Sequence, residues 1–124
     1  MKLLTAFVAA LAFAAPDAAR ASGTATPVLE IVTFRLMPGT DTAAFLDAAR
    51  GTEAALRDRG ALTRRFLTVD AGGLWTDVVE WTSHDAALAA AEAVMSEPSF
   101  HPFMMMIDPD SVAMRHASIL WRME

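Results

Sequence analysis

Runs of β-branched and aromatic residues alternate along the chain with segments in which apolar residues recur at helical spacing. In the first helical segment Phe45, Ala49, Thr52 and Leu56 follow one another at intervals of three and four and share one face. The strand-like runs are residues 28–36, 61–70, 74–82 and 111–123. The helical segments are residues 40–59 and 83–97. This order predicts a β-α-β-β-α-β domain, the ferredoxin-like arrangement of an α+β fold.

Turn and cap residues mark most of the boundaries. Gly60 is a suitable stop for the first helix, and Ser83 is a suitable cap for the second. Residues 71–73, Ala-Gly-Gly, predict a three-residue hairpin loop that needs positive φ. Pro98 ends the second helix, and the apolar spacing over 100–107 predicts an extra short helix before the last strand.

The N-terminus has the order of charges and apolar residues that is typical of a secretory signal peptide. Lys2 precedes an apolar run over residues 3–15, and Ala19 and Ala21 form a small-residue cleavage box. The run is shorter than the roughly 17 to 25 residues that cross a bilayer as a helix, which argues against a membrane anchor. We therefore expect cleavage after Ala21 and a periplasmic or secreted protein that does not insert into the membrane. In the mature chain we expect a flexible stub over residues 22–27, followed by one domain over residues 28–124.

The residue inventory excludes several kinds of chemistry. The chain has a net charge of -5, which becomes -6 when Lys2, Asp17 and Arg20 leave with the signal peptide, and it has no basic run. Nucleic acid is therefore not an expected partner. The expected mature chain contains no Cys, Tyr, Asn, Gln or Lys, so thiolate nucleophiles, Schiff-base lysines and side-chain amides are absent. No phosphate loop or paired-Cys zinc motif occurs, and no cofactor is expected.

Three stretches resemble the dimeric α/β-barrel superfamily, which includes antibiotic-biosynthesis monooxygenases and stress-responsive barrel proteins. They are Glu30-Ile-Val-Thr-Phe-Arg-Leu-Met-Pro-Gly39, Gly73-Leu-Trp-Thr-Asp-Val-Val-Glu-Trp81, and Ser83 with the Ala-rich helix that follows. The resemblance spans residues 28–123 and implies that two ferredoxin-like subunits pair their sheets into a closed barrel with a small-molecule cavity. Residues 28–36 are apolar on both alternating faces. Such a strand needs helices on one face and a second covering on the other, so we expect a homodimer.

Glu30 is a candidate ligand-binding residue because it lies within an apolar strand, at a position where stress-responsive barrels often carry His. A carboxylate in apolar surroundings can act as a base or as a ligand anchor. The alternative is a salt bridge to Arg64, Arg65 or Arg115 of a neighbouring strand. Both interpretations remain open on the sequence.

The three histidines differ in their expected positions. His116 lies in the last strand, between Met114 and Ser118 on one face, and is the best placed of the three for a functional role in the interior. The alternative is a structural core residue that only makes a hydrogen bond. His84, near a helix N-terminus, is expected on the surface. His101 precedes a Met-rich stretch, residues 104–106, whose thioethers suit Cu(I). The apolar spacing already explains Met104 as core, and we expect no metal site.

Three tryptophans complete the set of candidate ligand-binding residues. Trp75, Trp81 and Trp121 are expected on strands, where they line either a cavity or an interface. No combination of residues forms a catalytic set, so we expect a non-catalytic dimeric barrel that binds a small hydrophobic molecule or a partner. The alternative is a cofactor-independent monooxygenase-like enzyme acting on a small aromatic or polyketide-like substrate. Its related members use Asn, Trp and often Tyr, and this chain has neither Asn nor Tyr.

Overall fold

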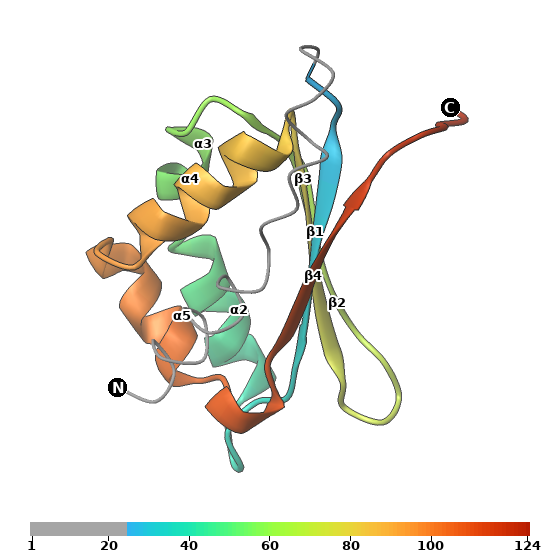
Figure 1. Ribbon diagram of the computed structural model, residues 1–124. Coiled ribbons are helices and arrows are strands. Elements are labelled where there is room, and N and C mark those ends of the chain that lie inside the picture. Colours follow the sequence, from blue (N-terminus) through green and yellow to red (C-terminus); the bar gives the residue numbers. More distant parts are fainter. Residues whose placement is uncertain (1–24) are drawn as a thin grey trace.

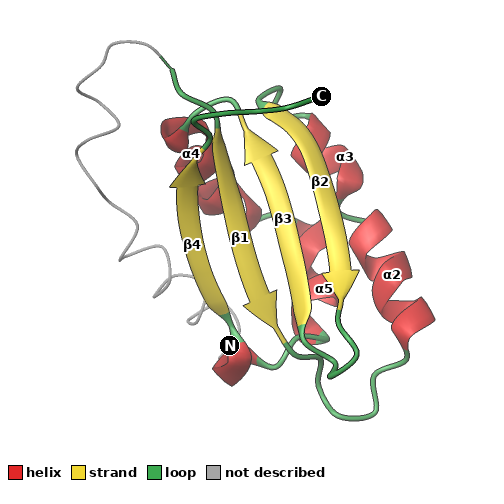
Figure 2. Cartoon of the chain, turned by 90° about the vertical axis from the view of Figure 1, so that its right-hand side faces the viewer, coloured by secondary structure: helices red, strands yellow, loops and turns green. Residues whose placement is uncertain are grey.

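A four-stranded antiparallel sheet with all of its described helices on one face forms the domain (Figure 1). The computed structural model describes residues 25–124, so the expected signal peptide lies outside the described residues. The strands are β1 (Val28–Phe34), β2 (Leu62–Val69), β3 (Trp75–Trp81) and β4 (Ala113–Ser118). They lie in the order β2-β3-β1-β4, and Figure 2 shows them side by side with the helices behind. The predicted ferredoxin-like α+β fold is thereby confirmed.

The first predicted helix consists of two shorter helices. They are α2 (Thr42–Arg50) and α3 (Glu53–Arg57), and the break falls at Gly51 and Thr52. The Asp41 carboxylate caps α2 by accepting a hydrogen bond from the Ala44 amide at 3.0 Å. The Thr52 hydroxyl donates to the Ala49 carbonyl at 2.6 Å, which satisfies a carbonyl at the end of α2. The apolar spacing continues through the break, and for this reason the sequence predicts one helix.

The second half of the helical layer follows the predicted order. Helix α4 (His84–Val94) begins after Ser83, whose hydroxyl accepts a hydrogen bond from the Ala86 amide at 3.0 Å, and ends three residues earlier than predicted. The short helix before the last strand is α5 (His101–Met105), between 3-10 turns at Pro98–Phe100 and Pro109–Ser111. Gly73 in the hairpin loop has φ of 85°, as predicted.

An aromatic cluster joins the helices to the sheet. The Phe45 ring of α2 lies 4.9 Å from the Trp75 ring of β3 and 5.1 Å from the Phe103 ring of α5, between centroids. Phe34 of β1 stacks on Trp75 at 6.5 Å. Because buried aromatic rings contribute both large apolar area and specific pair geometry, this cluster holds α2 and α5 against the sheet.

The last strand is shorter than predicted and continues as a tail over residues 119–124. The ladder between β4 and β1 ends where the Ile119 amide donates to the Pro27 carbonyl at 2.9 Å. Pro27 has no N–H to extend the ladder in return. Trp121, expected on a strand, therefore lies in the tail, where 77 % of it is exposed.

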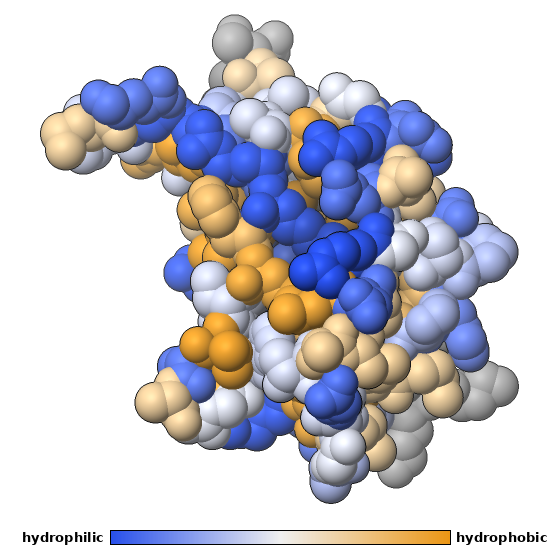
Figure 3. Space-filling model, turned by 180° about the vertical axis from the view of Figure 1, so that it is seen from behind, coloured by the Kyte–Doolittle hydropathy of each residue, from blue (hydrophilic) through white to orange (hydrophobic). Residues whose placement is uncertain are grey.

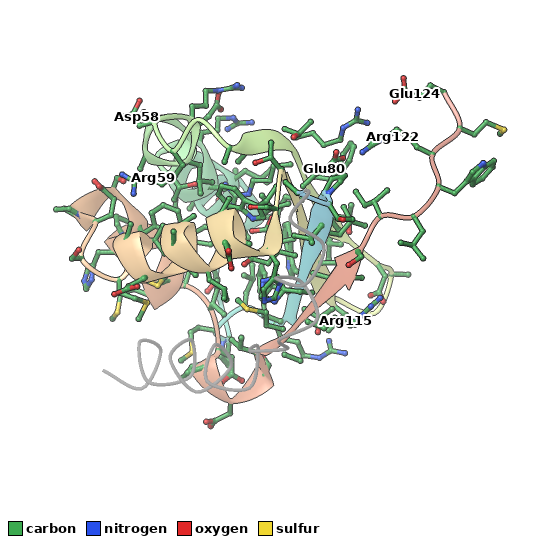
Figure 4. All side chains as sticks on the ribbon, turned by 45° about the horizontal axis from the view of Figure 1, so that its top comes forward. Asp58, Arg59, Glu80, Arg115, Arg122 and Glu124 are labelled. Carbon is green, nitrogen blue, oxygen red and sulfur yellow. The ribbon has the colours of Figure 1, made fainter. Side chains whose placement is uncertain are left out.

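One arginine of the tail returns to the sheet. Arg122 donates two hydrogen bonds to the buried carboxylate of Glu80 on β3, at 2.6 and 3.1 Å, and Figure 4 shows the two side chains beside each other. Arg64 lies 3.4 Å from the same carboxylate. The hydrogen bonds from Arg122, followed by the charges of Arg122 and Arg64, outweigh burial and hold the pKa of Glu80 below its ordinary value.

This lowered pKa predicts a specific pH dependence of stability. The ionised Glu80 stabilises the fold at pH values above the ordinary glutamate pKa, and this contribution is lost as the pH falls through the lowered pKa. We expect Glu80→Gln to reduce the free energy of unfolding at neutral pH and to flatten its decline below about pH 5. Denaturant titrations at several pH values would measure both effects. Glu124→Gln, which removes an exposed carboxylate 3.7 Å from the same arginine, is the control. An equal change in both variants would contradict the prediction.

Candidate functional site

A small cavity lies between the sheet and its helices, with a volume of about 60 Å³. Most of its wall is apolar and comes from β1, β3, α4 and α5. The apolar lining residues include Val32, Phe34, Trp81, Phe103, Met104 and Met114. The polar lining groups are Glu30, Arg65 and Asp77. Buried polar groups in an apolar cavity are a feature of ligand sites, so the hydrogen-bond partners of these three side chains decide what the cavity can bind.

Glu30 and His116 form a buried pair across two neighbouring strands. The antiparallel register sets Glu30 of β1 directly opposite His116 of β4, and both side chains point to the helical side of the sheet. The distance from His116 Nε2 to Glu30 Oε2 is 3.1 Å, and the side chains are 6 % and 11 % exposed. A carboxylate accepts, so Nε2 carries the hydrogen. None of the arginines considered for Glu30 is its partner. Arg64 and Arg65 pair with Glu80 and Asp77, and Arg115 lies opposite Ile31, on the other face of the sheet.

His84 belongs to the same buried cluster, contrary to the expectation that it lies on the surface. It is 7 % exposed at the start of α4, and its ring centroid lies 4.9 Å from that of His116 at an interplanar angle of 79°. His84 Nε2 and His116 Nδ1 are buried, and neither has a hydrogen-bond partner in the described part of the chain. The sequence signal that could have indicated this position is the spacing of His84 and Ala87, which lie three residues apart on the buried face of α4.

Arg65 and Asp77 make a second buried pair in the cavity wall. The guanidinium of Arg65 donates to both carboxylate oxygens of Asp77, at 2.8 and 2.9 Å. It also donates to the Thr52 hydroxyl at 2.8 Å and lies over the Phe103 ring, 5.4 Å from its centroid. Five donors in a rigid fork suit this arrangement, so Arg65 is held as a fixed part of the wall. Sequence reasoning considered Arg65 only as a partner of Glu30.

The predicted tryptophans occupy three different environments. Trp81 lines the cavity together with Glu30, and its buried Nε1 has no hydrogen-bond partner among the described residues. Trp75 belongs to the aromatic cluster and not to the cavity wall. Trp121 lies in the exposed tail. The structure thus brings together Glu30, His116 and Trp81, and leaves the other two candidates apart from them.

The Met-rich stretch after His101 is divided between core and surface. Met104 is buried, whereas Met105 is 55 % exposed. Within residues 25–124 no group of three or more His, Asp or Glu side chains is arranged to hold a metal ion. In the same part of the chain, no helix has the length and apolar character needed to cross a membrane.

Several solved structures share this arrangement of strands and helices. SnoaB from Streptomyces nogalater, described as a cofactor-independent oxygenase, aligns with a TM-score of 0.54 and 19 % identity over 81 % of this chain and 97 % of its own. A NIPSNAP family protein of unknown function from Agrobacterium tumefaciens aligns with a TM-score of 0.56 and 20 % identity, over 76 % and 88 % of the two chains. The chain shares with them the ferredoxin-like fold, a four-stranded antiparallel sheet with helices on one face. No family model and no curated protein matches its sequence. At such identity the likeness concerns the fold alone.

The Glu30 and His116 pair can be tested by a double-mutant cycle. Removing either side chain leaves a buried polar partner unsatisfied, and we expect each of Glu30→Ala and His116→Ala to lower the free energy of unfolding by about 1 to 3 kcal/mol. The double variant should lose clearly less than the sum of the two. Denaturant unfolding measures all three values, with the exposed His101→Ala as control. Strictly additive losses would contradict a direct interaction.

Proposed function

We propose that this is an exported homodimeric protein that binds a small, mostly apolar molecule in the cavity beside Glu30. The observation that carries the proposal is the buried carboxylate itself. One oxygen of Glu30 is held by His116, while the other makes no hydrogen bond to any residue in 25–124. A carboxylate with one free oxygen in an apolar cavity accepts a hydrogen bond from a ligand hydroxyl or amine, and such single polar contacts orient ligands in apolar sites.

The size of the cavity restricts the ligand. A volume of about 60 Å³ lies far below the roughly 300 to 1,000 Å³ that is typical of small-molecule sites. A single-ring compound therefore needs part of the wall to move. Met104 and Met114 line the cavity, and methionine side chains adapt readily to new shapes because they are unbranched and flexible. The ligand class that fits is a small apolar molecule with one hydrogen-bond donor.

Export is supported by the N-terminal sequence. The charge at Lys2, the apolar run over 3–15 and the small residues Ala19 and Ala21 follow the order of a signal peptide. Cleavage after Ala21 would give a mature chain that starts at Ser22, in the periplasm or outside the cell.

Homodimer formation is supported by the face of the sheet opposite the helices. On β1 this face carries the half-buried Leu29 and Ile31, and on β2 it carries Phe66, which is 52 % exposed. None of the helices within residues 25–124 covers this face (Figure 2). An apolar sheet face is stable in water when a second layer covers it, and a second copy of the chain supplies one.

A second candidate function is cofactor-independent oxygenation of a small aromatic substrate. The likeness to SnoaB suggests it, and the pair of Glu30 and His116 favours it because a buried carboxylate beside an imidazole is able to accept a proton from a phenol. The chain lacks the Asn and Tyr on which such enzymes rely. Binding without catalysis is therefore the better supported of the two.

Native mass spectrometry of the protein purified from its own host's envelope tests the proposal in one measurement. We expect a dimer of chains that begin at Ser22, with a small molecule retained in the wild type and absent from Glu30→Ala and His116→Ala. The same two variants should lose the rise in melting temperature that the recovered compound gives the wild type, since binding to the native state stabilises it. A monomer, a full-length mass, or a compound retained equally by both variants would each contradict the corresponding part of the proposal.

A further inference from the structure

A second and much larger hollow lies on the outer side of the domain, between helices α2 and α3 and the free edge of β2. Its volume is about 480 Å³, within the range of roughly 300 to 1,000 Å³ that is typical of small-molecule sites. The cavity beside Glu30 falls far below that range. We refer to this hollow as the outer groove.

The floor of the outer groove is apolar. Leu46 and Ala49 come from α2, Leu56 comes from α3, and Leu62 and Leu67 come from β2. All but Leu56 are only partly buried and pack against the core from outside. The pairing of β2 with β3 is irregular between Leu62 and Arg64, at the start of the strand that lines the groove. The result is a stripe of aliphatic side chains that stays in contact with solvent.

The rim of the outer groove is cationic, although the chain as a whole carries a net charge of -5. Arg50, Arg57, Arg64 and Arg65 line the groove, against Glu53 as the one lining carboxylate. Figure 3 looks onto this side of the molecule and shows hydrophilic side chains around a hydrophobic patch. An apolar floor with positively charged groups at its edge is complementary to an amphipathic anion.

Two of the rim arginines are available to such a ligand. Arg50 and Arg57 pair with Asp47 and Glu53 at 2.8 and 3.0 Å, but their side chains are 69 % and 68 % exposed. Exposed ion pairs of this kind contribute little to stability, so a bound carboxylate can replace the present partner at little cost. Arg65 is different, because Asp77 and Thr52 occupy its donors.

The outer groove and the cavity beside Glu30 are separate sites. Leu56 and Arg65 line both of them, so these two side chains form the wall between the two hollows. The Arg65 guanidinium is fixed by three hydrogen bonds, which keep the wall in place. A ligand in the groove therefore does not depend on the proposed role of Glu30.

We propose that the outer groove binds a free long-chain carboxylate, with its alkyl chain on the leucine floor and its carboxylate on Arg50 and Arg57. Burial of the alkyl chain supplies the affinity, because each buried CH₂ group removes apolar surface from water. The two arginines select the anion over a neutral molecule of the same length, because charge-assisted hydrogen bonds are the stronger ones.

Calorimetric titration of the protein purified from its own host's envelope with dodecanoate, below the micelle concentration of dodecanoate, tests the proposal. We expect one site per chain, binding that weakens as salt is added, and an affinity for dodecanol at least about tenfold lower. The double variant Arg50→Glu with Arg57→Glu should bind dodecanoate at least about tenfold more weakly. Arg59→Glu is the matched control: it reverses a charge in the same helical region, does not line the groove, and should change the affinity less than about twofold.

Each remaining outcome overturns the proposal. Failure of dodecanoate to bind would show that the groove does not take this class of ligand. Equal binding of dodecanol, or equal weakening by Arg59→Glu, would show that the rim arginines do not recognise the carboxylate. If light scattering shows that the double variant changes the oligomeric state instead, the groove is a contact between copies of the chain. Circular dichroism confirms that the variants are folded.

Discussion

The double pairing of β1 is the constraint on which the rest of the structure depends. This strand is hydrogen-bonded to β3 along one edge and to β4 along the other, over nearly its whole length. Both pairings are antiparallel, so the residues opposite one another share a face of the sheet. Glu30 is consequently placed opposite His116 on one side and Val79 on the other. A slip by one residue would move all of these side chains to the other face.

Buried carboxylates make this register costly to change. Glu30, Asp77 and Glu80 are all buried, and each has a partner from another strand or from the tail: His116, Arg65 and Arg122 respectively. Removing one partner and leaving the other charge buried lowers the free energy of unfolding by more than the intact pair contributes to it. The three pairs therefore act mainly by specifying one arrangement of the strands, and two of them form the polar lining of the cavity.

The fold by itself does not determine what the protein binds. The same arrangement of strands and helices occurs in a cofactor-independent oxygenase and in a NIPSNAP protein of unknown function. In this chain, the side chains that line its two hollows are the features that bear on binding. The inner cavity has a buried carboxylate and imidazole, whereas the outer groove combines an aliphatic floor with arginines at its rim. A function is therefore argued from these side chains and not from the shared fold.

The sequence by itself determined the order of the elements, most of their boundaries and the α+β class, because these depend on local spacing, caps and turn residues. It also singled out Glu30 and His116, each as a titratable residue among apolar neighbours. Only the tertiary structure decided that the two form a pair, since they lie 86 positions apart and meet through strand pairing. The burial of His84, the role of Arg65 and the exposed position of Trp121 likewise depend on which elements pack together. Contacts between distant segments are not encoded in any short stretch of sequence. Local patterns could therefore identify candidate residues but could not predict their partners or their burial.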